Sequence, residues 1–531
     1  MEKAVLLVSI IIIIRILLND FLEKIPVPSL IIFILLGMCF GENGLFKINF
    51  DNYSFVNIIC SVSLIFIMFY GGFGTNLKAA KPVVAQSVLL STVGVAGTAG
   101  AVGLFSHFVL HLTWLESILI GSVISSTDAA SVFNILRSRN LALKNNTDSL
   151  LEIESGSNDP ISYMLTTSLI AIMLGQDISV PALLIQQMLF GILFGVLVAK
   201  LSIYLFKTSL FKSQESVTIF LFAVMLLSFS LPYTLNGNGY LSVYLCGIIL
   251  GNSTLIHKKY LVHFFDVSTD VAQVIIFFLL GLLVTPVDLP RVMIPSLMIM
   301  LFLTLVARPL VSLILLAPFK SSPQQIALVS WSGLRGVASI VFAISVVLSG
   351  VQTKYNLFNL VFCIVILSIS IQGTLLPWVA NKLSMIDKNA DVRKTFNDYQ
   401  EDSDISFIKI HIDKNHPWKD LEISNLGLPR DLLIAMIVRN HSPIVPKGDT
   451  VLEVGDLLVF AARSFEDRKH LSLREVVIDK KSKWVNTPLH QITTENPYLI
   501  ILIKRNLENI IPTGDTILLP GDILIMATAE E

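Results

Sequence analysis

Charged side chains and cysteines are scarce in this sequence of 531 residues. Only 15% of the residues are Asp, Glu, Lys or Arg, whereas a soluble globular protein carries about 25%. The four cysteines (Cys39, Cys60, Cys246 and Cys363) lie far apart inside apolar stretches, and no C-x-x-C pair occurs. The formal net charge of −1 gives no indication of a nucleic-acid partner. These shortages exclude a single soluble enzyme, a disordered chain and a secreted disulfide scaffold.

The few charges are unevenly distributed along the chain. Residues 390–531 carry 39 charged side chains, whereas the 389 residues before them carry 38. The hydrophobic share of the whole sequence is 53% and the mean hydropathy is +0.74. A soluble domain of nearly 400 residues cannot hide so much apolar surface from water, so the first part is predicted to be a membrane domain. The last part has the composition of an ordinary globular domain.

Apolar runs long enough to cross a membrane recur along the first part. A spanning helix needs about 20 mainly apolar residues, and fewer where it is broken or buried in a bundle. Thirteen such spans are predicted, although the second and ninth are short and twelve is an alternative count. Their approximate bounds are 4–22, 27–41, 55–73, 83–105, 114–136, 149–174, 181–206, 216–232, 239–253, 267–286, 292–318, 323–350 and 356–382.

The charges of the connecting loops orient these spans. With thirteen spans, twelve Lys and Arg residues fall on one side of the membrane and three on the other. The positive-inside rule makes the first side cytoplasmic, which places the N-terminus outside and the polar C-terminal part inside. The three outer residues are Lys47, Arg291 and Lys354.

Thirteen spans can be divided into two halves of six spans each, joined by one linking span. Secondary transporters are often built in this way, as inverted repeats with a broken helix in each half. Each half here has a polar interruption at its fifth span, at Ser125–Asp128 and at Ser332–Gly336. The predicted fold is therefore an α-helical polytopic membrane protein with inverted repeats and two broken helices, followed by small cytoplasmic α/β modules.

A group of charged residues lies at membrane depth, where a charge costs several kcal/mol and usually faces a partner or a water-filled path. The acids concentrate in spans five and six and the bases in spans eleven and twelve, which suggests a charge-balanced core. The deep residues are Asp128, Glu152, Glu154, Asp159, Arg308 and Arg335.

Asp159 lies in the densest polar segment, ESGSNDP at Glu154–Pro160. Ser155 and Asp159 are four residues apart, so they share one helical face. Hydroxyl, amide and carbonyl oxygens close to a carboxylate are suitable ligands for a hard monovalent cation. Because burial disfavours the charged form of a carboxylate, a proton can compete with the cation. Competition for one carboxylate is sufficient for exchange.

The other deep charges have two interpretations each. Thr127 can supply oxygen ligands, and Asp128 either contributes to the site or only caps the broken helix. For Glu154, an ion pair with Arg335 or Arg308 is favoured over direct contact with the cation. Arg335 lies between two glycines and can neutralise the opposite break.

Four ordered segments resemble the monovalent cation:proton antiporters of the NhaP-type branch, over about residues 1–385. They are SSTDAA at Ser125–Ala130, ESGSNDP at Glu154–Pro160, WSGLRGVASI at Trp331–Ile340 and IQGTLL at Ile371–Leu376. The resemblance implies that Asn158 and Asp159 mark the transport site. It also implies that Thr127 and Asp128 occupy the family's broken helix, that Glu154 and Ser155 line the site, and that Arg335, and less clearly Arg308, is the core arginine.

The C-terminal part contains a duplication. Residues 439–462 and 505–528 align without a gap at an offset of 66, with 12 of 24 positions identical. Apolar runs rich in β-formers are separated by Gly-Asp turns, which predicts a small α/β module present twice. The module resembles the C-terminal, TrkA-type domain of regulators of potassium conductance. The predicted boundaries are 1–385 for the membrane domain, 386–404 for a linker, and 405–465 and 472–531 for the modules.

The sequence thus predicts a secondary transporter that exchanges a monovalent cation for protons, electroneutrally and one for one, across the inner or plasma membrane. Potassium is favoured only through the association with the modules, and sodium is an alternative. The expected ligands of the cation are Asp159, Ser155 and Thr127. No resident cofactor is predicted, although the resemblance makes a cyclic dinucleotide such as cyclic di-AMP a possible regulatory ligand. A homodimer in the lipid bilayer is expected.

Other classes of function were weighed against this one. A membrane enzyme would need a catalytic motif, but the nine histidines form no H-E-x-x-H and no G-x-S-x-G occurs. A cation channel would show a selectivity-filter loop of the T-V-G-Y-G kind, which is absent. The alternatives left are a channel of another type and a membrane sensor that does not transport, gated by the cytoplasmic modules.

Overall fold

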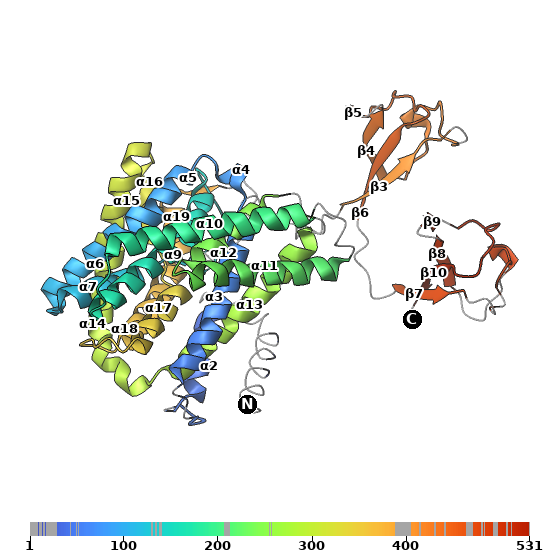
Figure 1. The fold of residues 1–531 in the computed structure, drawn as a ribbon. Coiled ribbons are helices and arrows are strands. Elements are labelled where there is room, and N and C mark those ends of the chain that lie inside the picture. Colours follow the sequence, from blue (N-terminus) through green and yellow to red (C-terminus); the bar gives the residue numbers. More distant parts are fainter. Residues whose placement is uncertain are drawn as a thin grey trace. The chain divides into compact units, whose positions relative to one another are not determined.

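The computed structural model divides into two compact units, a membrane unit (residues 1–400) and a C-terminal unit (residues 401–531) (Figure 1). Its described residues are 9, 13, 16, 29–42, 44–48, 50, 52–128, 131, 132, 135, 136, 141–206, 213–253, 255, 258–387, 405–413, 416–429, 432–439, 442–463, 471–478, 482, 484–491, 498–505, 508–510 and 512–529. The predicted first span, 4–22, lies almost wholly outside them.

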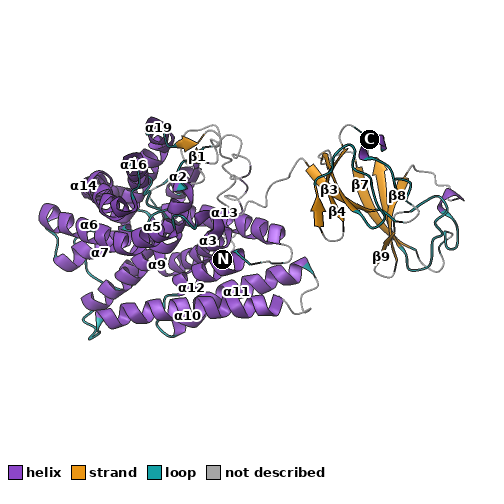
Figure 2. Ribbon diagram, turned by 90° about the horizontal axis from the view of Figure 1, so that it is seen from above, coloured by secondary structure: helices purple, strands orange, loops and turns teal. Residues whose placement is uncertain are grey.

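The membrane unit consists almost entirely of helices (Figure 2). In order they are α2 (Ser29–Phe40), α3 (Tyr53–Gly74), α4 (Leu77–Ala80), α5 (Val84–Leu89), η1 (Leu90–Gly94), α6 (Val95–Leu110), α7 (Trp114–Ile124), α9 (Thr147–Met173), α10 (Val180–Phe206), α11 (Gln214–Thr234), α12 (Gly239–Gly251), α13 (Lys258–Leu283), η2 (Pro286–Asp288), α14 (Leu289–Phe302), η3 (Leu303–Ala307), α15 (Arg308–Leu316), η4 (Ala317–Phe319), α16 (Pro323–Trp331), α17 (Val337–Leu348), α18 (Leu357–Leu367), η5 (Ser368–Gly373) and α19 (Thr374–Lys382).

Seven helices within the described ranges are long and apolar enough to cross a membrane, and four shorter ones are apolar. The long ones include several that continue through a π-helical or 3-10 segment, such as Val84–Leu110 and Leu357–Lys382. The helix α9 is 27 residues long, but its four acidic side chains set it apart from the others. The helical transporter architecture predicted from the sequence is therefore confirmed, while the count of thirteen spans stays a prediction.

Both predicted interruptions are present. The helix α7 ends at Ile124 and the next four residues, Ser125–Asp128, are not helical. The helix α16 ends at Trp331, and α17 begins at Val337 after a second irregular stretch. The spans before the two breaks also resemble each other, because each contains a five-residue π-helical segment, η1 and η3. These correspondences are what inverted repeats predict.

Small residues allow the helices of the membrane unit to approach closely. A Cβ atom added to Gly37 in α2 would lie 2.2 Å from the backbone oxygen of Phe278 in α13. At Gly72 in α3 it would lie 2.4 Å from the backbone oxygen of Tyr244 in α12. Because lipid gives helices little hydrophobic reason to associate, such close backbone packing is a main source of stability in membranes.

The described residues of the C-terminal unit form two four-stranded antiparallel sheets with the same strand order, and their strands are labelled in Figure 1. The first has the order β3-β6-β4-β5 and the second β7-β10-β8-β9. The β3–β6 pairing (Ile405 opposite Arg463) and the β7–β10 pairing (Leu471 opposite Ala529) have the same register. The strands are β3 (Ile405–His411), β4 (Leu432–Arg439), β5 (Ser442–Ile444), β6 (Leu457–Arg463), β7 (Leu471–Val477), β8 (Tyr498–Arg505), β9 (Glu508–Ile510) and β10 (Ile523–Ala529).

One ion pair recurs in both modules. Arg439 donates to the two carboxylate oxygens of Asp456, with both N···O distances 2.8 Å. Arg505 makes the same contact with Asp522, at 2.8 and 2.7 Å. In each module the aspartate is buried and lies in the Gly-Asp turn just before a strand, β6 or β10. The duplication therefore extends to the side chains that stabilise this turn.

Candidate functional site

The two helix breaks meet in the interior of the membrane unit. The backbone N–H of Asp128 donates to the carbonyl oxygen of Leu334, at 2.8 Å. Close to this bond, a Cβ atom on Gly336 would lie 2.4 Å from the Cβ of Asp128. Real Cβ contacts essentially never come below 3.0 Å, so only glycine allows this approach. The contact joins residues more than 200 positions apart, which the sequence order alone does not reveal.

The two sides of the first break are each matched by a charge of the opposite sign. Arg335 is buried, and its Nη1 donates to the carbonyl oxygens of Ser125 and Ser126, at 2.8 and 2.7 Å. These carbonyls follow the C-terminal end of α7, where the helix dipole is negative. Asp128 accepts from the backbone N–H of Ser131 at 3.2 Å and from its hydroxyl at 2.5 Å. An acid therefore caps the chain that resumes after the break, as one of the two sequence interpretations had it.

Asp159 lies against the first break from α9. Its side chain is 5% exposed, and its Oδ1 accepts a hydrogen bond from the hydroxyl of Ser126. Asn158 makes two hydrogen bonds with Thr127. Its Oδ1 accepts from the Thr127 N–H at 3.3 Å, and its Nδ2 donates to Thr127 Oγ1 at 2.5 Å. Ser155 donates to the Thr127 carbonyl oxygen at 2.6 Å. One face of α9 thus holds the unwound segment Ser125–Asp128 with two side chains, Ser155 and Asn158, and presents the carboxylate of Asp159 to it.

Four of the five residues predicted to form the cation and proton site, Asp159, Asn158, Ser155 and Thr127, are therefore brought together. The fifth, Asp128, lies one residue further along the break and faces Gly336 and Ser131. Within the described part of the chain, no three His, Cys, Asp or Glu side chains form a group that could hold a metal ion. The oxygens at this point come instead from one carboxylate, hydroxyls, an amide and the backbone, which suits a weakly bound monovalent cation better than a divalent one.

Glu154 pairs with Arg308. The Nη2 of Arg308 contacts the Oε1 of Glu154, and the two side chains are 3% and 1% exposed. Arg308 also lies against the second break, because a Cβ on Gly333 would be 3.0 Å from its Nε. Of the two arginines considered for Glu154, Arg308 makes the direct contact, whereas Arg335 binds the backbone carbonyls of the first break. The pair connects α9 with α15.

Pro160 leaves α9 intact. Because proline removes a backbone donor, the sequence predicts that the helix loosens near Pro160, but the helix is continuous from Thr147 to Met173. Since proline has no N–H, the carbonyl of Gly156 loses its usual partner four residues on. On the α12 side, Asn238 donates to the Pro160 carbonyl at 2.8 Å, and the ring of Tyr244 occupies the space that a Cβ of Gly156 would need. Packing from α12 therefore supports the helix where the proline weakens it.

Sequence reasoning missed Ser126, Ser368 and Gln372. Ser126 contacts Asp159 directly, and its position beside Thr127 in the same interruption was the available signal. In η5, Ser368 accepts from the Arg335 N–H at 3.1 Å and donates to Gln372 Oε1 at 2.5 Å. The backbone oxygen of Gln372 accepts from Trp331 Nε1 at 3.1 Å. The π-helical segment η5, which overlaps the Ile371–Leu376 motif, therefore holds the second break.

Comparisons with known proteins agree with this architecture. Residues 7–382 match the family described as "Sodium/hydrogen exchanger, transmembrane", and residues 408–464 and 473–531 match the TrkA-C domain. The K(+)/H(+) antiporter NhaP2 of Shewanella sp. (strain ANA-3) is 32% identical over 458 residues, which cover 84% of this chain and 78% of that protein. The K(+)/H(+) antiporter NhaP of Alkalimonas amylolytica is 31% identical, covering 85% and 80%.

A solved structure has the same fold. The sodium proton antiporter MjNhaP1 from Methanocaldococcus jannaschii, determined at pH 8, superposes with a TM-score of 0.64 at 24% identity, covering 72% of this chain and 99% of that one. The family match over residues 7–382 and the relatives at 31–32% identity establish the assignment. This protein belongs to the sodium/hydrogen exchanger family and carries two TrkA-C domains after its membrane unit.

Proposed function

We propose that this protein exchanges a monovalent cation for protons across the membrane, with Asp159 as the group that both ions share. The observation that carries the proposal is the buried Asp159 carboxylate, held against an unwound backbone segment by Ser126. A carboxylate at membrane depth is costly and marks an ion path in most transporters. Here it has oxygen-bearing neighbours that can replace part of the water shell of a cation.

The exchange follows from competition for one charge. When Asp159 is ionised, a cation can bind it together with the nearby hydroxyl and backbone oxygens. When Asp159 is protonated, its charge is neutralised by the proton, and the cation has no partner. The site carries the same net charge with a bound cation as with a bound proton. The domain can therefore expose the site alternately to the two sides of the membrane in both forms. Ser155 and Thr127 are the further proposed ligands of the cation, and the hydrogen bonds of Ser155 and Asn158 with Thr127 fix the unwound segment.

The transported cation is proposed to be potassium, with sodium as the alternative. The relatives that are 31–32% identical are named K(+)/H(+) antiporters, while the solved structure of the same fold is titled a sodium proton antiporter. Oxygen ligands suit both ions, so the selectivity depends on the shape of the site.

A flux assay tests the proposal. Full-length protein is reconstituted into vesicles that contain a pH-sensitive dye, and K+, Na+ or Li+ is added outside. Wild type should move protons in response to at least one of these cations, and Asp159→Asn should not. Asp177→Asn, which removes an exposed acid from the loop after α9, is the matched control and should transport normally. Undiminished exchange by Asp159→Asn would overturn the assignment.

The stoichiometry gives a second test. One carboxylate that loses one proton and binds one monovalent cation moves no net charge, so the exchange should be electroneutral and one for one. A sustained transport current that depends on the membrane potential, recorded on a solid-supported membrane, would contradict the single-carboxylate scheme.

The TrkA-C modules are proposed to regulate this exchange from the cytoplasmic side of the inner or plasma membrane, and the N-terminus is proposed to lie outside. The proposed module boundaries are 405–465 and 472–531, after a linker at 386–404. A cyclic dinucleotide such as cyclic di-AMP is the proposed class of ligand, on resemblance alone. A homodimer is also proposed, which the mass of the protein–detergent complex tests by light scattering.

A short sheet supports a physical connection between the linker and the site. The strand β2 (Ile386–Asp387) at the start of the linker pairs antiparallel with β1 (Ala142–Leu143). The Lys144 N–H donates to the Met385 carbonyl at 2.8 Å. The helix α9 begins at Thr147, three residues after Lys144. At a rise of 1.5 Å per residue, Asp159 lies about 18 Å along the helix from Thr147. Tension on the linker would therefore act on the helix that carries the site.

Truncation tests the regulatory part. Ending the chain after Lys388 keeps β2 but removes both modules. This protein should still transport, with a shifted pH dependence or apparent cation affinity, because a regulator can act only by favouring one state of the domain. In the full chain, Lys144→Pro removes the backbone donor to Met385 and should cause a similar shift, whereas Lys144→Arg keeps that donor and a side-chain donor for the Ser384 carbonyl and should not. Identical transport by the truncated and full chains would reduce the modules to a cap.

A further inference from the structure

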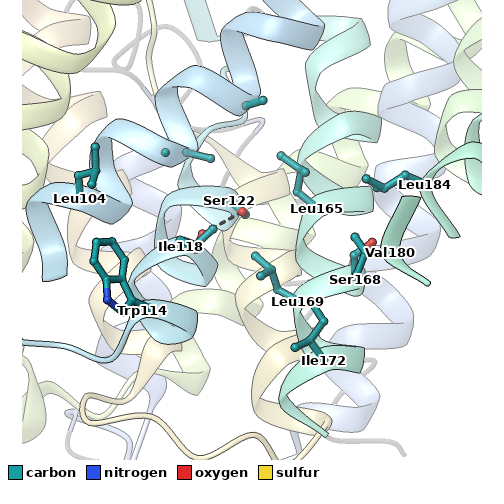
Figure 3. A pocket seen from close by; sticks show the side chains of 13 residues that line it. Leu104, Trp114, Ile118, Ser122, Leu165, Ser168, Leu169, Ile172, Val180 and Leu184 are labelled. Carbon is teal, nitrogen blue, oxygen red and sulfur yellow. Dashed lines mark hydrogen bonds between the residues drawn. The ribbon is translucent and has the colours of Figure 1, made fainter. Parts of the chain in front are cut away.

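An apolar pocket with a volume of about 370 Å³ lies between α6, α7, α9 and α10 (Figure 3). Its size is within the range of pockets that hold small ligands, about 300–1,000 Å³. Leu104 and Trp114 line one side and Leu169 and Leu184 the other (Figure 3). The pocket belongs to no part of the ion site described above, since Asp159 and the unwound segments are not among its lining residues.

The chemistry of the lining excludes an ion or a polar solute. None of the thirteen lining residues is charged. The two serines among them already donate on their own helices, Ser122 to the Ile118 carbonyl at 2.9 Å and Ser168 to the Met164 carbonyl at 2.8 Å. A charged or strongly polar group placed in the pocket would lose its water and gain at most the two hydroxyl oxygens and the Trp114 N–H, which costs free energy. The occupant must therefore be a hydrocarbon.

The position of the pocket identifies the source of that hydrocarbon. Leu104 and Trp114 are 51% and 48% exposed, and they continue into exposed apolar side chains on the same helices, such as Phe108 on α6 and Leu115 on α7. In membrane-spanning helices such a surface faces lipid. Trp114 is the first residue of α7, where an amphipathic indole can lie at the level of the lipid headgroups. We propose that the pocket binds one acyl chain of a bilayer phospholipid.

The bound chain would lie directly behind the ion site. Ser122 is three residues before the first break, and its carbonyl oxygen accepts from the Ser162 hydroxyl at 2.6 Å. That hydrogen bond joins α7 to α9 between the pocket and the site. Leu165, on the pocket side of α9, follows Asp159 by six residues. An acyl chain that fills the pocket therefore supports the two helices whose contact forms the site, and binding of lipid is coupled to their arrangement.

Quenching of Trp114 by brominated acyl chains measures this binding without any transport assay. Full-length protein in detergent is titrated with a phosphatidylcholine that carries dibrominated chains, and the tryptophan fluorescence is recorded. Subtracting the signal of Trp114→Phe isolates Trp114 from the other four tryptophans. The expected result is saturable quenching that reaches its limit at about one lipid per chain, as a single pocket requires.

A pocket-filling variant gives the decisive comparison. A Cβ on Gly100, which lines the pocket, would meet no atom within 4 Å, so Gly100→Leu fills the space without a backbone clash and should abolish saturable quenching. Gly71→Leu adds the same side chain to open space in α3 and should leave it unchanged. Ala96→Phe, at an exposed position of the lining, adds no tryptophan and gives a second blocking variant if Gly100→Leu does not fold.

Three results would overturn the proposal. Quenching of wild type that never saturates would mean that Trp114 only meets bulk lipid. Saturation that is unchanged in the blocking variants would place the lipid elsewhere. Saturable quenching by a brominated free fatty acid but not by the phospholipid would assign the pocket to a free fatty acid instead. Because the measurement involves no ion, its outcome does not depend on whether Asp159 is the transport carboxylate.

Discussion

Adding a single methyl group at Gly336 should separate the two helix breaks and impair exchange. The Cβ of Gly336→Ala would lie 2.4 Å from the Cβ of Asp128 and 2.5 Å from its Oδ2. The backbone of Gly336 has φ −137° and ψ −159°, an extended conformation that alanine also adopts. The effect of the substitution is therefore steric, and no change in backbone preference complicates it.

The size of the effect follows from these distances. Non-bonded carbon atoms come to rest at about 3.5–4.0 Å, so the two breaks must move apart by roughly 1 Å. The 2.8 Å hydrogen bond from Asp128 to Leu334 cannot survive such a shift, because hydrogen bonds weaken sharply beyond about 3.2 Å. A displacement of about 1 Å at a functional site can cost about 100-fold in rate, and overpacking costs about 1–3 kcal/mol in stability.

The assay is the dye-loaded vesicle flux, normalised to the amount of folded protein recovered by size exclusion. Gly336→Ala should reduce the exchange rate by about 100-fold while the protein still elutes as a folded species. Gly71→Ala, where a Cβ would meet nothing within 4 Å, is the control and should transport normally. An exchange rate for Gly336→Ala close to that of wild type would refute the inference that the close contact of the breaks supports transport.

Two further predictions concern buried ion pairs. Replacing either Glu154 or Arg308 by Gln should lower the stability of the purified protein by about 3–5 kcal/mol, because the remaining charge is left buried. The double variant should lose less stability than the two single variants added together. Additive losses in thermal unfolding would contradict the pairing. In the C-terminal unit, burial by itself raises the pKa of Asp456, but hydrogen bonds from Arg439 and the Glu453 N–H and the guanidinium charge hold that pKa below its ordinary value. The stabilisation from this lowered pKa should be fully present above the unfolded value of about 4 and disappear as the pH falls through the folded value. Thermal unfolding of that unit should show this, and Asp456→Asn should be less stable at neutral pH and lose the acid-dependent part.

The membrane class and the two breaks could be predicted because they are strong local signals. An apolar run interrupted by Ser125–Asp128 or by Ser332–Gly336 is unusual enough to indicate a broken helix without any knowledge of its neighbours. The grouping of Asn158 and Asp159 on α9 follows from spacing on a single helix. The duplicated modules could be recognised because two segments of one chain can be compared directly.

The pairing of groups on different helices could not be predicted in the same way. The sequence left both Arg308 and Arg335 as partners for Glu154, and the choice depends on how the two breaks cross. Ser126 was overlooked because its contact with Asp159 joins α7 to α9. The proline in α9 suggested loosening, but a helix packed on both sides tolerates the loss of one hydrogen bond. Tertiary contacts decide each of these points, and local spacing does not encode them.

Release of protons on cation binding tests the role of Asp159 most directly. Purified full-length protein in a weakly buffered detergent solution receives KCl, or choline chloride as a control for ionic strength, and a pH indicator follows the solution. Because a cation ligand must be deprotonated to bind, wild type should release up to about one proton per chain on addition of K+ and none with choline. Asp159→Asn should release none with either salt. Equal release by wild type and Asp159→Asn would show that the proton comes from another group, which would contradict the account.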